Sequence, residues 1–328
     1  MKIWKPPTTA FGTDRDRNLD TVRGVACILL VLYHAAGAGP NDGLRLDPTS
    51  WYSLTNDFLA YIRMPLFAFL SGVVYARRPL VPGHGAAFAR GKMKRLLIPF
   101  ICITLLFTIV QKLTPGTNAS LEWSEIPQTL VWPYGHLWFI AALLWVFALV
   151  GCLDHFRALE RPLNAAILFL IASTAFEFRY GAVGAFAWNR ALYLLPFFLA
   201  GLVLTRFGWK WVVACAAIPL FVHQWEITIG ALFGVAILAL MPTVPLLARI
   251  GFFSYSIYLL HVFGTAGARI VMLHAGVDSI PLLLLVGTLA GIVLPIAADL
   301  VLARVPFLSR AILGVYPAAP RSKAAVKP

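Results

Sequence analysis

Long apolar segments recur from Leu19 almost to the C-terminus, and they restrict the chain to very few folds. An α-helix needs ~20 mostly apolar residues to cross a bilayer. Backbone polar groups in lipid must find partners inside the protein, so only helices or a closed β-barrel can span it. The segments here are long and continuous, unlike the ~10-residue alternating strands of a barrel. We therefore expect an all-α fold, a polytopic transmembrane helical bundle.

The apolar segments divide the chain into ten expected spans. They cover residues 19–38, 54–75, 96–112, 136–152, 163–179, 188–205, 211–224, 227–242, 250–273 and 281–303. The seventh and eighth are the least regular, because Pro219 interrupts one and a short polar link separates the two. We expect residues 1–18 to form a cytoplasmic N-terminal segment, residues 19–310 the integral membrane domain, and residues 311–328 a disordered cytoplasmic tail.

Composition and charge agree with a membrane protein. Only 12% of the 328 residues are charged, against about 25% in soluble domains. The net charge of +13 would suggest nucleic-acid binding in a soluble protein, but membrane proteins concentrate Lys and Arg in their cytoplasmic connections. With the N-terminus in the cytoplasm, 21 of the 27 Lys and Arg lie on that side, and the exceptions are Arg45, Arg63, Lys112, Arg179, Arg190 and Arg269. We therefore expect both termini in the cytoplasm, membrane lipids as partners, and no nucleic acid.

The cysteines do not form a recognisable site. Cys27, Cys102, Cys152 and Cys215 lie inside or at the edge of apolar segments and make no CxxC pair. We interpret them as small packing residues, and we expect no metal and no bound cofactor. The chain also lacks the motifs of zinc proteases, α/β-hydrolases and nucleotide-binding loops.

The first span carries a stripe of polar residues. Asp20 and Arg23 are three residues apart and can pair on one helical face. Cys27 follows on the same stripe, and His34, eleven residues after Arg23, returns to within ~20° of it. Histidine is suited to general-base catalysis near neutral pH, and an ionisable residue within a membrane is a functional candidate. The alternative is that His34 only makes a hydrogen bond to a neighbouring helix and that the side chain of Arg23 only extends to the membrane–water interface.

Two other regions place basic residues where they need a partner. Arg63 lies well inside the second span and must face a cavity or a carboxylate such as Asp57, as a structural pair or as a substrate contact. Arg90, Lys94 and Arg95 belong to a basic connection, residues 76–95, on the cytoplasmic side. That connection could set the topology through anionic lipid, or it could bind phosphate.

Two later spans carry polar and aromatic residues. His136 and Trp138 stand at the external start of the fourth span, where interfacial side chains are common. In the ninth span one helical face is polar, so it must point into the bundle, as a hydrogen-bond seam or as part of a binding site. Its members are Ser254, Tyr258 and His261, with Tyr255 at the edge.

In this order on a ten-span chain, these motifs resemble the bacterial acyltransferase family 3 of membrane O-acyltransferases, over nearly the whole length. The resemblance is carried by residues 19–24 (LDTVRG) with His34, residues 64–72 (MPLFAFLSG) with Ser71, residues 136–139 (HLWF) and residues 254–261 (SYSIYLLH). Residues 195–201 (LPFFLAG) are similar to the sixth span of that family. The MPLF and HLWF forms look most like the branch that contains fucose and exopolysaccharide O-acetylases.

The resemblance implies an O-acetyltransferase of the bacterial inner membrane. It would move an acyl group, expected to be acetyl, from cytoplasmic acyl-CoA to a carbohydrate such as an exopolysaccharide, an O-antigen or a lipid-linked oligosaccharide. Arg23 and His34 match the Arg and His of the family's first helix, so we expect Arg23 to orient the donor and His34 to act as general base or acyl carrier. The family's RxxxR motif has no clean match here. Arg90 and Lys94 keep the spacing of the motif but end it in a lysine, whereas Arg95 better fits the motif's usual distance from the proline that follows it. We expect all three residues to hold the CoA phosphates. The supporting or acceptor-site candidates are Asp20, Arg63, Ser71, His136, Trp138, Tyr255, Tyr258 and His261.

A transporter or flippase for a lipid-linked sugar is the alternative. A cavity lined by Arg63, His136 and His261 would serve it equally well. The basic connection and the stripe from Arg23 to His34 favour the acyltransferase, since a transporter needs no site for CoA phosphates. A purely structural scaffold fits poorly with so many polar groups inside the membrane.

Overall fold

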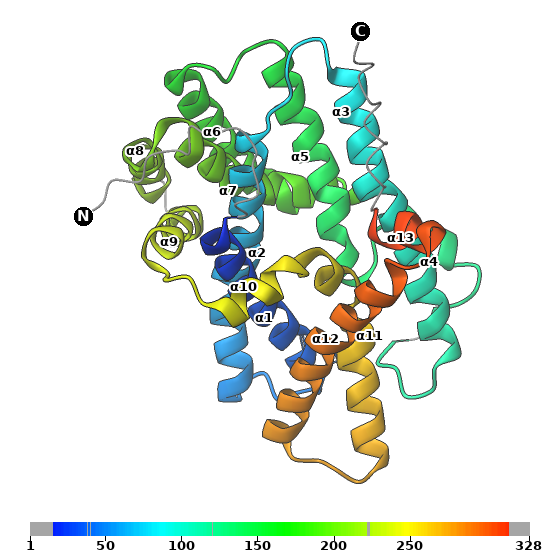
Figure 1. Ribbon diagram of the computed structural model, residues 1–328. Coiled ribbons are helices and arrows are strands. Elements are labelled where there is room, and N and C mark those ends of the chain that lie inside the picture. The colour runs from blue at the N-terminus through cyan, green and yellow to red at the C-terminus, as the bar shows by residue number, and fades with distance from the viewer. Residues whose placement is uncertain (1–15, 38, 40, 120, 222–223, 315–328) are drawn as a thin grey trace, which may run out of the picture.

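The chain folds into an all-helical bundle in the computed structural model, which describes residues 16–37, 39, 41–119, 121–221 and 224–314 (Figure 1). The helices are α1 (Arg17–Ala36), α2 (Trp51–Arg77), α3 (Gly85–Lys92), the π-helical η1 (Met93–Leu97), α4 (Ile98–Leu113), α5 (Trp138–His155), α6 (Pro162–Glu177), α7 (Trp188–Phe207), α8 (Trp209–Phe221), α9 (Trp225–Leu240), α10 (Pro245–Phe252), α11 (Ser254–His274), α12 (Ile280–Leu302) and α13 (Pro306–Leu313). Short 3₁₀ turns link some of them, among them η3 (Gly135–Leu137) just before α5.

The expected membrane spans are present as helices. Eight helical stretches of the described residues are long and apolar enough to cross a membrane, and α8 and α9 are two shorter apolar helices. Together they coincide with the ten segments that the sequence predicts, including the two irregular ones. The prediction of an all-α, polytopic bundle is therefore confirmed.

Three boundaries differ from the sequence prediction. The basic connection predicted at residues 76–95 is helical from Gly85, because α3 continues through η1 into α4. The ninth span, predicted from residue 250, begins at Ser254, and α10 is a separate helix before it. Residues 311–313 of the predicted tail belong to α13, whereas residues 1–15 and 315–328 lie outside the described residues. Both α10 and α13 begin at a proline that follows an extended valine, an arrangement that favours the start of a new helix.

Glycine pairs bring the central helices into backbone contact. A Cβ atom on Gly24 of α1 would overlap a backbone carbonyl of α10, and one on Gly251 of α10 would overlap a carbonyl of α1. Gly72 of α2 and Gly201 of α7 are related in the same way. Small residues let helices in lipid approach closely and gain van der Waals contact. The pairs hold α1, which carries His34, against α10, and α2, which carries Arg63, against α7.

A buried ion pair joins the last turns of three helices, α2, α5 and α7. Arg206 of α7 makes a bidentate pair with Asp154 of α5, with N–O distances of 2.8 and 2.6 Å. The hydroxyl of Tyr75 on α2 donates to the same carboxylate at 2.6 Å. Because each charge is hydrogen-bonded, the pair fixes the mutual orientation of α2, α5 and α7 without leaving an unpaired buried charge.

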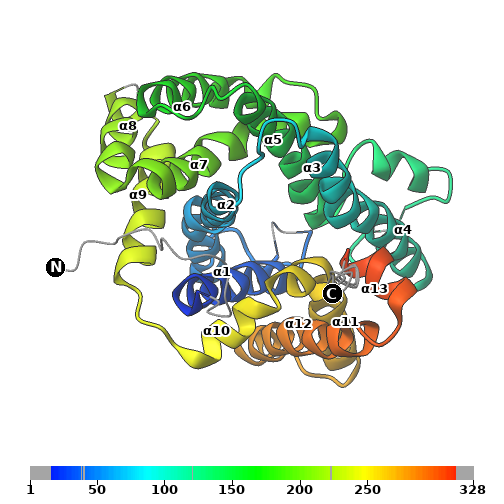
Figure 2. The same ribbon diagram turned by 45° about the horizontal axis from the view of Figure 1, so that its top comes forward.

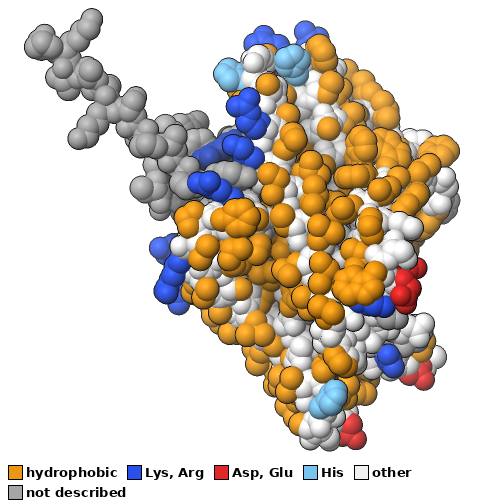
Figure 3. Space-filling view, turned by 90° about the vertical axis from the view of Figure 1, so that its right-hand side faces the viewer, with side chains coloured by type: hydrophobic (Ala, Val, Ile, Leu, Met, Phe, Trp, Pro, Cys, Tyr) orange, Lys and Arg blue, Asp and Glu red, His pale blue; other side chains and the backbone are white. Residues whose placement is uncertain are grey.

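The two ends of the bundle differ in charge. The α2–α3 and α5–α6 connections lie at the top in Figure 1 and the α11–α12 connection lies at the bottom. In Figure 2, α1 and α2 lie near the centre, with α6, α8 and α9 on one side and α4, α11 and α12 on the other. On the face in Figure 3, hydrophobic side chains cover a broad middle zone, most Lys and Arg gather in the upper part, and the acidic side chains lie in the lower part. By the positive-inside rule we expect the upper end to face the cytoplasm and the lower end the exterior, and we name the two ends accordingly.

Candidate active site

A cavity of about 670 Å³ lies toward the external end of the bundle. Its walls come from the last turns of α1 and α4, most of α11, the first half of α2, the starts of α5 and α7, and the connections beside them. This volume is typical of cavities that bind a small molecule. Its polar and aromatic lining includes His34, Arg63, His136, Trp138, Arg190, Tyr193, Tyr258 and Arg269.

Three histidines from distant parts of the chain meet at this cavity. His34 comes from the last turn of α1, His136 from η3, and His261 from the middle of α11. The ring centroids of His34 and His261 are 4.8 Å apart, those of His136 and His261 4.8 Å, and those of His34 and His136 5.9 Å. His34 and His136 line the cavity, while His261 is fully buried behind them. We call these three residues the histidine cluster.

Backbone carbonyls fix the tautomers of the two deeper rings. Nδ1 of His261 lies 2.9 Å from the carbonyl oxygens of both Ile257 and Tyr258, and Nε2 of His136 lies 3.3 Å from the carbonyl oxygen of Leu259. A carbonyl oxygen only accepts, so these nitrogens carry the protons in the neutral rings. The other nitrogens, Nε2 of His261 and Nδ1 of His136, are buried and have no hydrogen-bond partner among the described residues. Two unused acceptor nitrogens therefore stand beside His34.

Arg63 faces the cavity and finds neutral partners there. Its Nη1 donates to the backbone and side-chain oxygens of Asn56, both at 2.8 Å. Its guanidinium lies 4.0 Å above the ring of Tyr33, whose centroid is 4.8 Å from that of His34. Of the two partners that the sequence left open, a cavity or a carboxylate such as Asp57, the structure gives the cavity. Arg63 is thus in place to contact a bound molecule near His34.

The polar face of α11 connects the basic segment to the histidine cluster. The hydroxyl of Tyr255 donates to the carbonyl oxygen of Arg95 in η1. One turn later the hydroxyl of Tyr258 donates to the carbonyl oxygen of His136 at 2.6 Å, and His261 follows after another turn. The six residues from 255 to 261 correspond to a rise of about 9 Å. This face is thus a hydrogen-bond seam at Tyr255 and Tyr258 and part of the cluster at His261.

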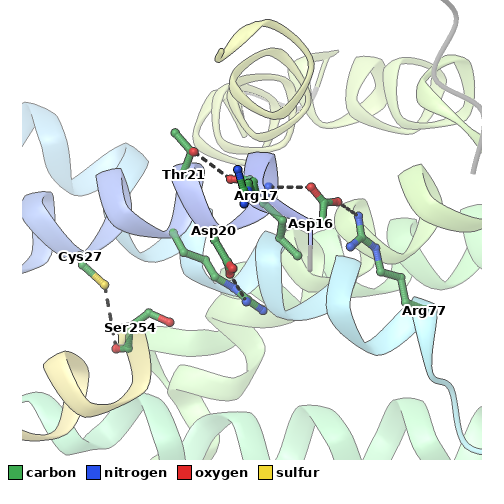
Figure 4. Close-up of polar contacts among 9 residues, drawn as sticks. Asp16, Arg17, Asp20, Thr21, Cys27, Arg77 and Ser254 are labelled. Carbon is green, nitrogen blue, oxygen red and sulfur yellow. Dashed lines mark hydrogen bonds and ion pairs between the residues drawn. The ribbon is translucent and has the colours of Figure 1, made fainter. Parts of the chain in front are cut away.

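The remaining expected residues lie elsewhere. Asp20 and Arg23 pair at 3.0 Å on α1, as the spacing predicts, but neither lines the cavity. Beside Asp20, Arg77 of α2 pairs with Asp16 at 2.7 Å (Figure 4). Partial burial would raise the pKa of Asp16, but the amide of Leu19 and the guanidinium of Arg77 together lower it. This cluster ties the cytoplasmic end of α1 to α2.

The basic residues expected to bind the donor are also remote from the cavity. Arg90, Lys94 and Arg95, the basic triad, are exposed on α3 and η1 and do not line it. Ser71 donates to the carbonyl oxygen of Phe67 in its own helix at 2.8 Å and does not line the cavity either. The structure therefore separates a cavity at the external end from a basic surface at the cytoplasmic end.

The comparison with protein families gives one match. The model of acyltransferase family 3, described as an acyltransferase domain, matches residues 16–300. The chain belongs to this family. No curated protein and no solved structure matched the chain. The match extends from α1 into α12, so it includes the histidine cluster and the basic triad.

Family membership confirms the resemblance that the motifs indicated, at the level of the family. The protein is a multi-pass membrane acyltransferase, and such an enzyme needs an acyl donor and an acceptor. The branch, the acyl group and the acceptor are not decided by the match. They stay predictions from the HLWF and MPLF forms.

Several residues at this acyltransferase's cavity were not singled out from the sequence. Tyr33, Arg190, Tyr193 and Arg269 line the cavity, and Asn56 accepts hydrogen bonds from Arg63. Two of them had a signal: Arg190 and Arg269 are exceptions to the positive-inside rule, as is Arg63. An arginine that stays on the unfavoured side of a membrane needs a reason, and all three line the cavity. The aromatic residues and Asn56 had no such signal in a sequence rich in aromatic residues.

Proposed function

We propose that the protein is an O-acyltransferase of the bacterial inner membrane. It moves an acetyl group from cytoplasmic acyl-CoA to a hydroxyl of a surface or lipid-linked carbohydrate. The observation that carries the proposal is the position of His34, which faces a cavity large enough for a saccharide unit and is backed by two histidines with unused acceptor nitrogens. Family membership supplies the reaction class.

His34 acts as the general base in this mechanism. It takes the proton of the acceptor hydroxyl as the hydroxyl oxygen attacks the thioester carbonyl, and the carbon–sulfur bond then breaks. The proton passes from His34 to the departing thiolate, so the products are the ester and CoA thiol. The transient imidazolium is stabilised by the neighbouring neutral rings, in the role that a carboxylate plays beside the histidine of a catalytic triad.

The donor approaches from the cytoplasmic end. The basic triad offers exposed guanidinium and ammonium groups to the CoA phosphates, which Arg binds in a bidentate manner and Lys as a point charge. Tyr255 of α11 donates a hydrogen bond to Arg95 of the basic triad. Along α11, Tyr255 and His261 are separated by a helix rise of about 9 Å. An extended pantetheine arm is long enough to bridge that rise. Arg23, held by Asp20 near the cytoplasmic end of α1, orients the donor along the way.

Analysis of surface polysaccharide tests the proposal. A strain that lacks the gene should retain its polysaccharide but lose one specific O-acyl group. The wild-type gene and the His274→Ala variant should restore the group, because His274 is an exposed histidine outside the cluster. His34→Ala should not restore it, although the protein inserts normally. Loss of the polymer itself in the deletion strain would instead indicate a transporter or flippase.

A further inference from the structure

The cavity holds an excess of positive charge. Arg63, Arg190 and Arg269 all line it, and Asp42 is its one carboxylate among the described residues. None of the three arginines forms an ion pair within the described part of the chain. An unpaired guanidinium in a partly desolvated site is costly to keep, so its presence calls for a counter-charge.

Each arginine keeps donor capacity for a ligand. Arg63 is only 3% exposed, and its two protein hydrogen bonds both use Nη1. Arg269 is 8% exposed; it donates to the carbonyl oxygens of Gly43 and Gly116, and its Nε is buried without a partner among the described residues. Arg190 is exposed at the start of α7, with its guanidinium 5.3 Å from the ring of Trp138. The carbonyl and amide partners orient Arg63 and Arg269 but carry no charge. Asp57 acts electrostatically on Arg63 without forming an ion pair with it.

Other external cations show the contrast. Lys112 pairs with Glu122 at 3.4 Å, and Arg179 pairs with Glu226 at 3.5 Å. Neither Lys112 nor Arg179 lines the cavity. Arg45, the remaining exception to the charge rule, is exposed and acts electrostatically on Arg269, which adds to the positive potential. Lys112 and Arg179 thus form ion pairs with carboxylates, whereas the three arginines in the cavity form none within the described part of the chain.

We propose that the acceptor is an anionic saccharide, whose phosphate or carboxylate group binds to Arg63, Arg190 and Arg269. This rests on the proposed function, in which the cavity receives the acceptor. Trp138 and Tyr193 supply aromatic surface against which a sugar ring packs, and Arg190 lies over Trp138, so ring and anion are recognised side by side. The CoA phosphates are a different anion, because their expected site, the basic triad, lies on the other side of the membrane.

Equilibrium binding without acyl-CoA tests the inference. The purified full-length protein in detergent is titrated with radiolabelled D-glucose, D-glucuronate and glucose 1-phosphate. At least one anionic probe should bind about ten- to a hundredfold more tightly than glucose, the factor typical of one charged hydrogen bond. Preference for glucuronate indicates an acidic sugar, and preference for glucose 1-phosphate indicates a sugar phosphate such as that of a lipid-linked saccharide; both support the proposal.

Substitutions locate the preference. Arg190→Gln should lower the affinity for the anionic probe about tenfold and leave glucose binding unchanged, whereas Arg190→Lys should keep part of the preference. Lys112→Gln is the matched control, because it removes an external charge outside the cavity, and it should change neither affinity. Arg63→Gln is a second, buried variant that should act in the same direction as Arg190→Gln.

Three results would overturn the inference: equal or undetectable affinities for all three probes, an anionic preference that survives both Arg190→Gln and Arg63→Gln, or displacement of the probe by CoA. The assay is independent of acyl transfer. If O-acyl transfer is confirmed and no anionic preference is found, only this inference fails. If the preference is found and the polysaccharide analysis shows no loss of an O-acyl group, the proposed function fails instead.

Discussion

His261→Phe tests whether the histidine cluster works as a unit. The residue is fully buried, and phenylalanine keeps a ring in its place while it removes both nitrogens. Nε2 of His261 has no partner among the described residues, and its ring lies 4.8 Å from that of His34. If it accepts a hydrogen bond from the imidazolium of His34 in the transition state, its loss removes one charge-assisted bond, worth about 1.5–3 kcal/mol. At about 1.4 kcal/mol for each factor of ten, kcat should fall about ten- to a hundredfold.

The assay separates this role from a structural one. The KM for the acceptor should change by less than about threefold, because an interaction made only in the transition state affects kcat and not ground-state binding, and His261 does not line the cavity. His274→Phe, the same substitution at an exposed position of α11, should leave both constants unchanged. A His261→Phe enzyme that inserts normally and retains a wild-type kcat would refute the reasoning, and the cluster would then be a packing arrangement.

Other predictions concern the packing, the donor and the topology. Gly24→Val should lower the free energy of unfolding by about 1–3 kcal/mol, because the valine side chain would overlap a backbone carbonyl of α10. Thermal unfolding in detergent measures this effect, and Gly91→Ala, at a position in open space, is the control. An unchanged Tm of the Gly24→Val protein would contradict the prediction. Replacing the basic triad with Gln should weaken acyl-CoA binding at least about tenfold, whereas Lys210→Gln should not, and equal affinities for the triad variant and wild type would reduce the triad to a topology signal. Reporter fusions near Glu122 and at Lys327 should report opposite sides of the membrane, and the same side for both would exclude the ten-span topology.

The sequence predicted the features that depend on local pattern. Apolar length gave the ten helices, and the three-residue spacing of Asp20 and Arg23 gave their ion pair. Local pattern also placed His261 on a polar face of its span, as a hydrogen-bond seam or as part of a binding site. It did not indicate that the ring of His261 contacts the ring of His34.

The sequence could not show which helices pack together. His34, His136 and His261 are more than a hundred residues apart from one another in sequence, and no repeat or covalent link specifies their meeting. Their approach depends on which faces of α1 and α11 pack against η3, a property of the whole bundle. The break between α10 and α11 was missed for a similar reason. The sequence predicted one span over residues 250–273, whereas the close approach of Gly24 and Gly251 holds α10 against α1 as a separate helix.

The most direct test of the account is acyl transfer by the His34→Ala variant in vitro. Membranes that contain wild-type or variant protein in equal amounts are incubated with radiolabelled acetyl-CoA and with polysaccharide from the deletion strain, and label in the polysaccharide is counted. The wild-type protein should transfer label, and His34→Ala should be slower by about 10²–10⁴-fold, the usual contribution of a general base. If His34→Ala kept more than about a tenth of the wild-type rate, far above what loss of a general base allows, His34 would not be the base, and the central claim would be wrong.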